Sequence, residues 1–336
     1  MRIRNNILTA VLIIVAITES FSVGINVESI QKDLVAQRYT SAKESLQRLL
    51  RQKPDDLNAL YLELAINQTE ILDYESYSLD GKQFIAKADS IKKIIEAKLP
   101  SLRGRDSVMS LFYLANVYGG ISVMHAKVGE WIEGTKNGLA SVALLKKVKK
   151  VQPDFLAANL GVGLYNYYFG NSMNWIPFSG NKVEKGLNDI EIATRSEFPF
   201  NYAAKNSLCW ILIEREEFKR ADSVAESVLE DYPENTIFLR IRSMINLYVG
   251  AYPKAISHAN QLLAISKDRT PVNWSDMVAA YYILVESYQK SGLINETVIA
   301  ADTILNENIP LAFLTMPQIK KNLKRIRDIK EKLCEK

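Results

Sequence analysis

A pattern of small and apolar residues that returns at one fixed spacing constrains the fold of this chain more than any other feature. One copy holds Phe218, Ala221, Ala225 and Val228, and the next holds Tyr252, Ala255, Ala259 and Leu262. Residues three and four apart lie on one face of an α-helix, so each copy predicts one amphipathic helix. A fixed repeat length indicates stacked copies of one structural unit, in place of a single globular core.

The same register extends over most of the chain. It appears near the start as Tyr39, Ala42, Leu46 and Leu49, and near the end as Ile294, Thr297, Ala301 and Ile304. Turn residues such as Pro153 and Pro233 separate the helical segments, and the alternation typical of strands is nearly absent. The pattern predicts an all-α protein of about fourteen helices.

The helix before each copy carries a leucine, then a small or β-branched residue, and a tyrosine or leucine three residues on. The instances are Leu114-Ala115 with Tyr118, Leu160-Gly161 with Leu164, Leu208-Cys209 with Leu212, and Leu284-Val285 with Tyr288. These residues and the fixed repeat length resemble the tetratricopeptide repeat, although Arg242 and Asn246 stand where that family has leucine and tyrosine. The resemblance implies a right-handed superhelical solenoid of antiparallel helix pairs.

Together the register and the resemblance divide the chain into four parts. They are a signal peptide at 1–22, divergent tetratricopeptide-like repeats at 23–200 with an aromatic insert at 170–182, regular repeats at 201–314, and a basic amphipathic capping helix at 315–336. The segment 266–275 also holds more chain than a tight turn between helices requires. Gly161-Val162-Gly163 lacks the third glycine of a dinucleotide-binding motif and is predicted to pack helices.

The N-terminus has the three parts of a secretory signal. Arg2 and Arg4 precede an apolar run from Ile7 to Ile17, and Ser20 and Ser22 supply the small residues that a signal peptidase needs. As a helix, the apolar run spans about 17 Å, short of the roughly 30 Å hydrocarbon layer. We therefore expect export to the periplasm or cell envelope after cleavage. An uncleaved anchor in the inner membrane is the alternative.

The formal net charge of +4 arises at the C-terminus. Residues 320–336 contain eight lysines or arginines and three acids, which is a local charge of +5 and leaves −1 for the rest of the chain. Because no basic face extends over the body, we expect no nucleic-acid partner. Membrane contact is expected only through the N-terminal segment or the basic C-terminal helix.

The sequence lacks the signatures of common catalytic and metal sites. It has no zinc-protease, phosphate-loop or serine-hydrolase motif, and His125 and His258 are its only histidines. Cys209 falls inside a predicted helix and is expected to be a small buried residue. The sequence therefore predicts no catalytic residue, no metal and no cofactor, and a protein that is not an enzyme.

The first helix of each tetratricopeptide repeat lines a concave groove. In the last three repeats here, its inward positions supply six candidate contact residues: Asn206, Trp210, Arg240, Met244, Tyr282 and Glu286. Such a mixture of aromatic, apolar and charged side chains suits an extended peptide or a helix. The resemblance thus implies a scaffold or adaptor in the envelope with a protein or peptide partner. The alternative is that an insert or the next helix fills the groove.

The aromatic insert supports a second hypothesis. Tyr165, Tyr168, Trp175 and Phe178 can wall a pocket for a sugar or another small ligand. Glycoside hydrolysis needs only two acids about 5–9 Å apart, and the nearby acids are Glu191, Glu197, Glu214, Glu216 and Glu217. The alternative function is therefore a carbohydrate-binding or glycoside-hydrolysing envelope protein, unless the aromatic residues only fold the insert onto the repeats.

Overall fold

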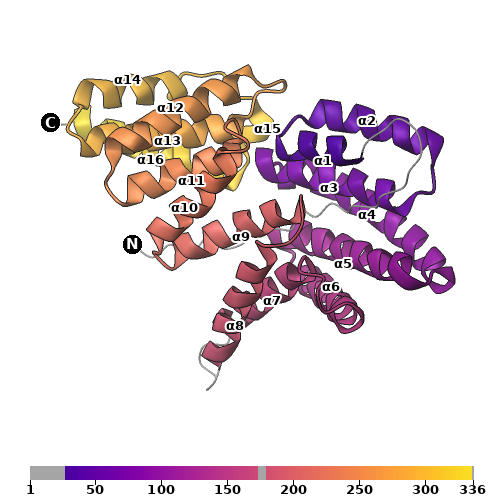
Figure 1. Ribbon diagram of the computed structural model, residues 1–336. Helices are drawn as coiled ribbons and strands as arrows, with labels where there is room; N and C mark the ends of the chain where they lie inside the picture. The colour runs from indigo at the N-terminus through magenta and orange to yellow at the C-terminus, as the bar shows by residue number, and fades with distance from the viewer. Residues whose placement is uncertain (1–26, 173–178, 335–336) are drawn as a thin grey trace. The chain divides into compact units, whose positions relative to one another are not determined.

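The computed structural model describes residues 27–172 and 179–334, and in these ranges it is all-α, with sixteen α-helices, one 3-10 helix (η1, Leu99–Ser101) and no strand (Figure 1). The predicted signal peptide, Trp175 and Phe178 lie outside the described residues. Two compact units are present. Unit 1 runs to Leu72 and resumes over Asp80–Leu208, and unit 2 comprises Asp73–Leu79 and the chain from Cys209 onward.

Seven successive helix pairs account for fourteen of the helices. They are α1 (Val27–Val35) with α2 (Tyr39–Gln52), α3 (Leu57–Tyr74) with α4 (Tyr77–Lys98), α5 (Gly104–Lys127) with α6 (Trp131–Val151), α7 (Ala158–Ser172) with α8 (Ser179–Ala193), α9 (Phe200–Glu214) with α10 (Phe218–Leu229), α11 (Thr236–Tyr248) with α12 (Tyr252–Asp268), and α13 (Trp274–Lys290) with α14 (Ile294–Leu305). The short helix α15 (Leu311–Leu314) and the final helix α16 (Pro317–Cys334) follow.

Six of these pairs share one turn geometry. A residue with φ between 53° and 87° stands two positions before the second helix in each pair, at Gln37, Glu75, Gly129, Glu216, Gly250 and Gly292. The next amide often donates to the carbonyl five residues earlier, as Ala251 does to Asn246 at 2.9 Å, which is a Schellman-type helix end. Only three of the six residues are glycines, so only half of these turns can be recognised from a glycine in the sequence. The pair α3 and α4, where the sequence pattern is weak, has the same turn as the other pairs.

Aromatic side chains fill the interior of unit 1. Phe112 of α5 lies edge-on to Phe155, with ring centroids 4.7 Å apart, and to Phe200 of α9 at 5.5 Å. Tyr61 of α3 stacks on Tyr113 at 4.7 Å. Edge-to-face and offset-stacked rings attract each other beyond the area that they bury, so these contacts join residues that are distant in the sequence.

Two glycines let α7 and α8 approach closely. A Cβ atom on Gly163 would lie 2.8 Å from the carbonyl oxygen of Gly186, and a Cβ on Gly186 would lie 2.5 Å from the amide nitrogen of Tyr167. Neither backbone atom can move aside as a flexible side chain can. The prediction that the Gly161-Val162-Gly163 stretch packs helices is therefore confirmed at Gly163.

Within the described residues, α5 alone is long and apolar enough to cross a membrane by length and composition. Most of its apolar window, 72%, is buried inside the protein. Phe112, Ala115 and Met124 are among its fully or almost fully buried residues. Burial against neighbouring helices accounts for this apolar composition.

The helices of unit 2 pack in the order of the sequence, and α11 also contacts α13. The helices α10 and α12 begin one repeat length apart, at Phe218 and Tyr252. Six register residues have no exposed surface: Ala221, Ala225, Val228, Ala255, Ala259 and Leu262. Cys209 is also buried, and its thiol donates to the carbonyl of Ala221 at 3.5 Å. These contacts confirm the register in this unit, because small side chains occupy the sites where paired helices meet.

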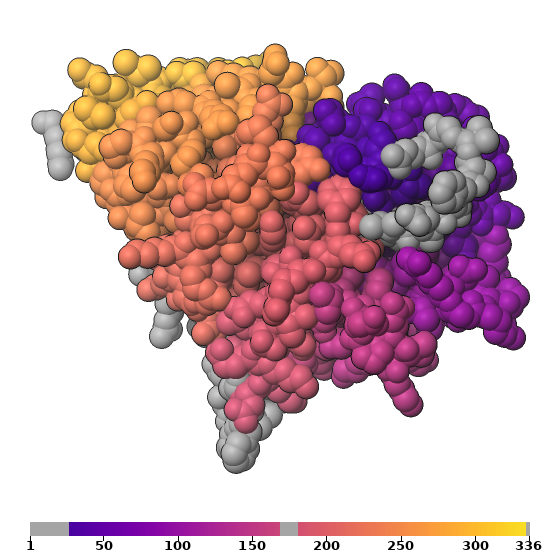
Figure 2. Space-filling model, viewed as in Figure 1, coloured from indigo at the N-terminus to yellow at the C-terminus, as the bar shows by residue number. Residues whose placement is uncertain are grey.

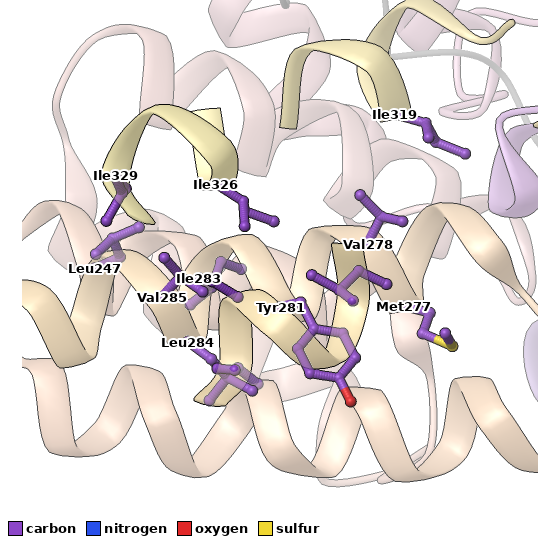
Figure 3. Packing of buried hydrophobic residues seen from close by; sticks show 14 of the residues in the cluster. Leu247, Met277, Val278, Tyr281, Ile283, Leu284, Val285, Ile319, Ile326 and Ile329 are labelled. Atoms are coloured by element: carbon purple, nitrogen blue, oxygen red, sulfur yellow. The ribbon is translucent and has the colours of Figure 1, made fainter. Parts of the chain in front are cut away.

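The final helix, α16, packs on α13 and α14. Its side chains Ile319, Ile326 and Ile329 lie on the side that faces α13 (Figure 3), and all three are at most 1% exposed. They belong to a cluster that also includes Val278 and Ile283 of α13. The apolar stripe of α16 is therefore covered by the preceding helix pair.

Candidate functional site

Arg240, a predicted groove residue, lies on α11 in a buried polar cluster of unit 2. One of its terminal nitrogens is 3.1 Å from a carboxylate oxygen of Glu75 and 3.1 Å from one of Asp276. The Arg240 side chain is 5% exposed and the Asp276 side chain is completely buried. An arginine that is buried in this way must be paired, because an unpaired buried charge is strongly destabilising.

The turn between α3 and α4 supplies half of this cluster. Its residues 73–79 belong to unit 2, and we call them the docked corner. The carboxylate of Asp73 pairs with Arg269 and accepts hydrogen bonds from Thr236 at 3.1 Å and Asn273 at 3.4 Å. Asp73 has no exposed side-chain surface. The carboxylate of Asp73 thus links the docked corner to Thr236, Arg269 and Asn273, which come much later in the sequence.

Backbone contacts hold the docked corner as well. The hydroxyl of Ser275, in the first turn of α13, donates to the carbonyl of Tyr74 at 2.8 Å. The side-chain amide of Asn273 donates to the carbonyl of Asp73 at 3.3 Å, and the hydroxyl of Tyr74 donates to the carbonyl of Pro271 at 3.1 Å. Unit 2 therefore binds this turn by main chain and side chain together. The extra residues at 266–275 provide several of the contacts.

The cluster contains three carboxylates, on Asp73, Glu75 and Asp276, and two guanidinium groups, on Arg240 and Arg269. Burial raises the pKa of Asp276 to about 7, Asp73 adds to the rise, and Arg240 opposes it. Burial alone would lower the pKa of Arg240, but Asp276 and Glu75 raise it overall. Arg240 therefore keeps its charge, whereas burial makes the Asp276 carboxylate easier to protonate than an exposed one.

Glu286 forms a second buried contact, between α13 and the final helix. One of its carboxylate oxygens accepts from Arg325 of α16 at 2.6 Å, and the other lies 3.9 Å from Lys290. Burial raises the pKa of the neighbouring Tyr282 to about 12, and the negative charge of Glu286 adds to the rise. The carboxylate of Glu286 is thus neutralised within unit 2.

The structure separates the six predicted groove residues into two groups. Arg240 and Glu286 are buried in ion pairs, and Asn206, which belongs to unit 1, is 2% exposed. Trp210, Met244 and Tyr282 belong to unit 2 and remain partly exposed. We call these three residues the first-helix face. Binding by the six residues stays a prediction.

Two of the insert residues can be placed. Tyr165 and Tyr168 of α7 are half-buried. The ammonium group of Lys146 lies 6.0 Å from the centre of the Tyr165 ring, and Tyr168 stands edge-on to Tyr167 at 5.3 Å. Trp175 and Phe178 lie outside the described residues, so a pocket walled by all four residues also stays a prediction.

The acids at the end of α9 have different surroundings. Glu217 pairs with Arg215 at 2.7 Å and with Arg220, and the hydrogen bond from Arg215 lowers its pKa. Burial raises the pKa of Glu214. Glu217 is held by two arginines across the turn into α10, which suits a structural role. No group of three histidine, cysteine or acidic side chains in the described part of the chain is arranged to hold a metal ion.

Sequence patterns did not predict the docked corner, because its residues lie next to the most divergent part of the repeat. Two signals point to it in hindsight. Asp73-Tyr74-Glu75-Ser76-Tyr77 combines acids and tyrosines at a helix end, and the extra residues 266–275 include Asn273, the N-cap of α13. Neither signal indicates that residues 73–77 and 266–275 contact each other, because that contact depends on the tertiary structure.

Solved structures of tetratricopeptide repeat proteins resemble this chain at low sequence identity. No protein-family model and no curated protein matches the sequence. The C-terminal part of a TPR repeat-containing protein from Cytophaga hutchinsonii is 15% identical, with coverage of 88% of this chain and 98% of that one and a TM-score of 0.44. The TPR domain of P58(IPK) is 14% identical, with coverage of 91% and 97% and a TM-score of 0.28. From its own helix pairs, repeated turns and buried register, this chain has an all-α, tetratricopeptide-like repeat fold.

Proposed function

We propose that this protein is a non-enzymatic scaffold or adaptor of the cell envelope that binds a peptide or helix of another exported protein. The docked corner is the observation that carries this proposal. Within unit 2, Arg240, Ser275 and Asn273 bind a chain segment through its carboxylates and main-chain carbonyls. These are interactions that peptide-binding surfaces use.

The first-helix face supplies the surface for the partner. Trp210 and Met244 lie one repeat length apart, at equivalent positions of successive repeats, and both are partly exposed together with Tyr282. Aromatic residues and methionine are enriched in protein interfaces, where a few side chains provide most of the binding energy. We expect an apolar segment of the partner to pack here. Arg240 and Glu286, which are already paired, would keep α11 and α13 in position.

The test is a comparison of partner capture from an envelope extract. The bait is the full chain, as wild type or as the double variant Trp210→Ala/Met244→Ala. The control is Ile294→Ala/Ile299→Ala, which removes exposed apolar side chains from α14, a second helix of its repeat. We expect wild type and control to retain a partner that the first variant loses, and direct titration with the purified partner to show at least tenfold weaker binding.

Two results of that experiment would count against the proposal. One is recovery of no protein by wild type beyond what the Trp210→Ala/Met244→Ala variant recovers. The other is an equal loss in both variants, which indicates general destabilisation. Circular dichroism of each variant shows whether its helices are intact.

The envelope location has its own test. We expect mass spectrometry of the protein, expressed with its natural N-terminus, to find a mature chain that begins shortly after residue 22, and osmotic shock to release it with the periplasmic proteins. A full-length chain that stays with the membrane indicates an uncleaved anchor. A full-length chain in the cytoplasm excludes this part of the proposal.

A further inference from the structure

The final helix, α16, has two faces of opposite character. One is the apolar stripe that packs on α13 and α14. The other is exposed and carries Lys320, Lys321, Lys324 and Arg327, which we call the cationic face. On an α-helix these four positions fall within about a third of the circumference. The C-terminal residues, drawn in yellow, form part of the molecular surface in Figure 2.

Two other cations of α16 serve the fold instead. Arg325 pairs with Glu286 of α13 at 2.6 Å, and Lys330 pairs with Asp302 of α14 at 2.5 Å. In the described part of the chain, no ion pair involves the four residues of the cationic face. The helix therefore uses some of its positive charges for internal contacts and leaves the others facing the solvent.

On the N-terminal side of the cationic face the nearest acid in the sequence is Glu307, and the first acids to follow the face are Asp328 and Glu331. Between Glu307 and Asp328 the chain contains no aspartate or glutamate. Exposed charges act over about 10 Å at 0.1 M salt, so four neighbouring cations produce a positive local field despite the small net charge of the chain. Leu311 of α15, just before α16, is 79% exposed and adds an apolar side chain to this acid-free segment.

The cationic face is also fixed in place. Ile319, Ile326 and Ile329 anchor α16 in the core of unit 2 (Figure 3), so the four cations stand on a rigid helix and lose little backbone freedom on binding. Three of them are lysines, which interact as point charges and lack the planar fork of arginine. Such a face suits a broad anionic surface better than one shaped carboxylate or phosphate group.

We propose that the cationic face of α16 binds an anionic lipid surface. Each lysine or arginine near such a surface strengthens binding about fivefold, and an exposed apolar side chain such as that of Leu311 adds contact with the interfacial region. Nucleic acid fits less well, because α16 has no aromatic residue on which bases could stack. The interaction would place unit 2 at a membrane surface and is independent of the first-helix face.

The test measures sedimentation of the full chain with vesicles of phosphatidylcholine alone or with about one third phosphatidylglycerol. The variant is Lys320→Gln/Lys321→Gln/Lys324→Gln/Arg327→Gln. The matched control, Lys93→Gln/Arg105→Gln/Lys147→Gln/Lys150→Gln, removes the same charges from exposed positions of α4, α5 and α6. Any binding through the N-terminal apolar segment appears equally in all three proteins on the neutral vesicles.

We expect phosphatidylglycerol to increase the binding of wild type and control at low salt, and about 0.5 M salt to abolish the increase. The α16 variant should lose at least a hundredfold in affinity for the anionic vesicles. Equal losses in variant and control would show a general charge effect and overturn the proposal. The proposal would also be overturned if phosphatidylglycerol did not increase the binding of the wild type. That outcome includes the case in which the cationic face binds an acidic polymer such as soluble polyglutamate but not the vesicles.

Discussion

Units 1 and 2 join distant helices by different chemistry. In unit 1 the rings of Phe112, Phe155 and Phe200 meet edge to face, and glycines bring α7 and α8 together. In unit 2 a buried cluster of five charged side chains holds the docked corner against α11 and α13. The same repeat geometry thus accommodates contacts that depend on shape and contacts that depend on charge.

Apolar and ionic contacts differ in how strongly they depend on the identity of each residue and on pH. Apolar packing tolerates many residues of similar volume and changes little with pH. A buried ionic cluster requires particular partners at particular positions, and one missing member leaves an uncompensated charge. We therefore expect unit 2 to depend on individual charged residues and on pH, and unit 1 to depend mainly on volume.

The largest expected effect is that of Arg240→Met. The substitution leaves Asp276 and Glu75 without their shared cation, and we expect it to lower the free energy of unfolding by about 3–5 kcal/mol, measured by urea denaturation. The control on the same helix is Arg242→Met, whose pairs with Asp222 and Glu226 are partly exposed and should contribute about 1 kcal/mol or less. Equal effects of the two substitutions would remove the distinction between a buried cluster and surface pairs.

The corresponding test of shape in unit 1 is Gly186→Ala. Its Cβ would meet backbone atoms of α7 at 2.5–2.9 Å, so the helices must move apart, at an expected cost of about 1–3 kcal/mol at any pH between 5 and 8. Gly81→Ala is the control, since its nearest neighbour would be 3.9 Å away. The control should be neutral or stabilising, because alanine favours a helix more than glycine does. A neutral Gly186→Ala would disprove the close approach.

The pH dependence of unit 2 is the third prediction. The pKa of Asp276 is about 7 in the folded protein and near 3.8 without burial. Between these two pKa values the folded state binds a proton that the unfolded state has released, and this difference stabilises the folded protein. The contribution is lost as pH rises through 7, with a slope of at most about 1.4 kcal/mol per pH unit. Asp276→Asn should remove this contribution from the difference in unfolding free energy between pH 6 and pH 7. An unchanged slope in the variant would assign the titration to another group.

The smallest expected effect concerns Glu217, a partly exposed counterpart to the buried cluster. Arg215 lowers its pKa, so the sign is opposite: its contribution is present at neutral pH and is lost as pH falls through the lowered pKa. Glu217→Gln should cost less than about 1 kcal/mol at pH 7, and high salt should reduce the difference further. Calorimetry at two salt concentrations measures it. A larger effect that is insensitive to salt would place Glu217 with the buried charges.

The repeat itself could be predicted, because it depends on local rules. The buried register from Ala221 to Leu262 follows from helical spacing and small side chains, and Pro233 and Gly292 mark turns by their own backbone limits. The other turns could not be found this way. Gln37, Glu75 and Glu216 adopt positive φ although ordinary residues are strained there, and their sequence carries no mark of it.

The candidate site was predictable only in part. The resemblance to the tetratricopeptide repeat implied inward positions for Arg240 and Glu286, and both do point to other elements. The sequence could not show that Glu75 and Arg325 would neutralise them. Trp210, Met244 and Tyr282 remain partly exposed, a distinction that depends on which elements lie across from each residue.

The sequence by itself determined that this chain forms helix pairs in a repeating register, since spacing, small residues and turn residues act over short stretches of chain. It also determined that the positive charge gathers on α16. Only the tertiary structure decided that residues 73–79 join unit 2 and that burial raises the pKa of Asp276. Burial and the pairing of charges depend on segments that are far apart in the sequence, and no local pattern records which of them will meet.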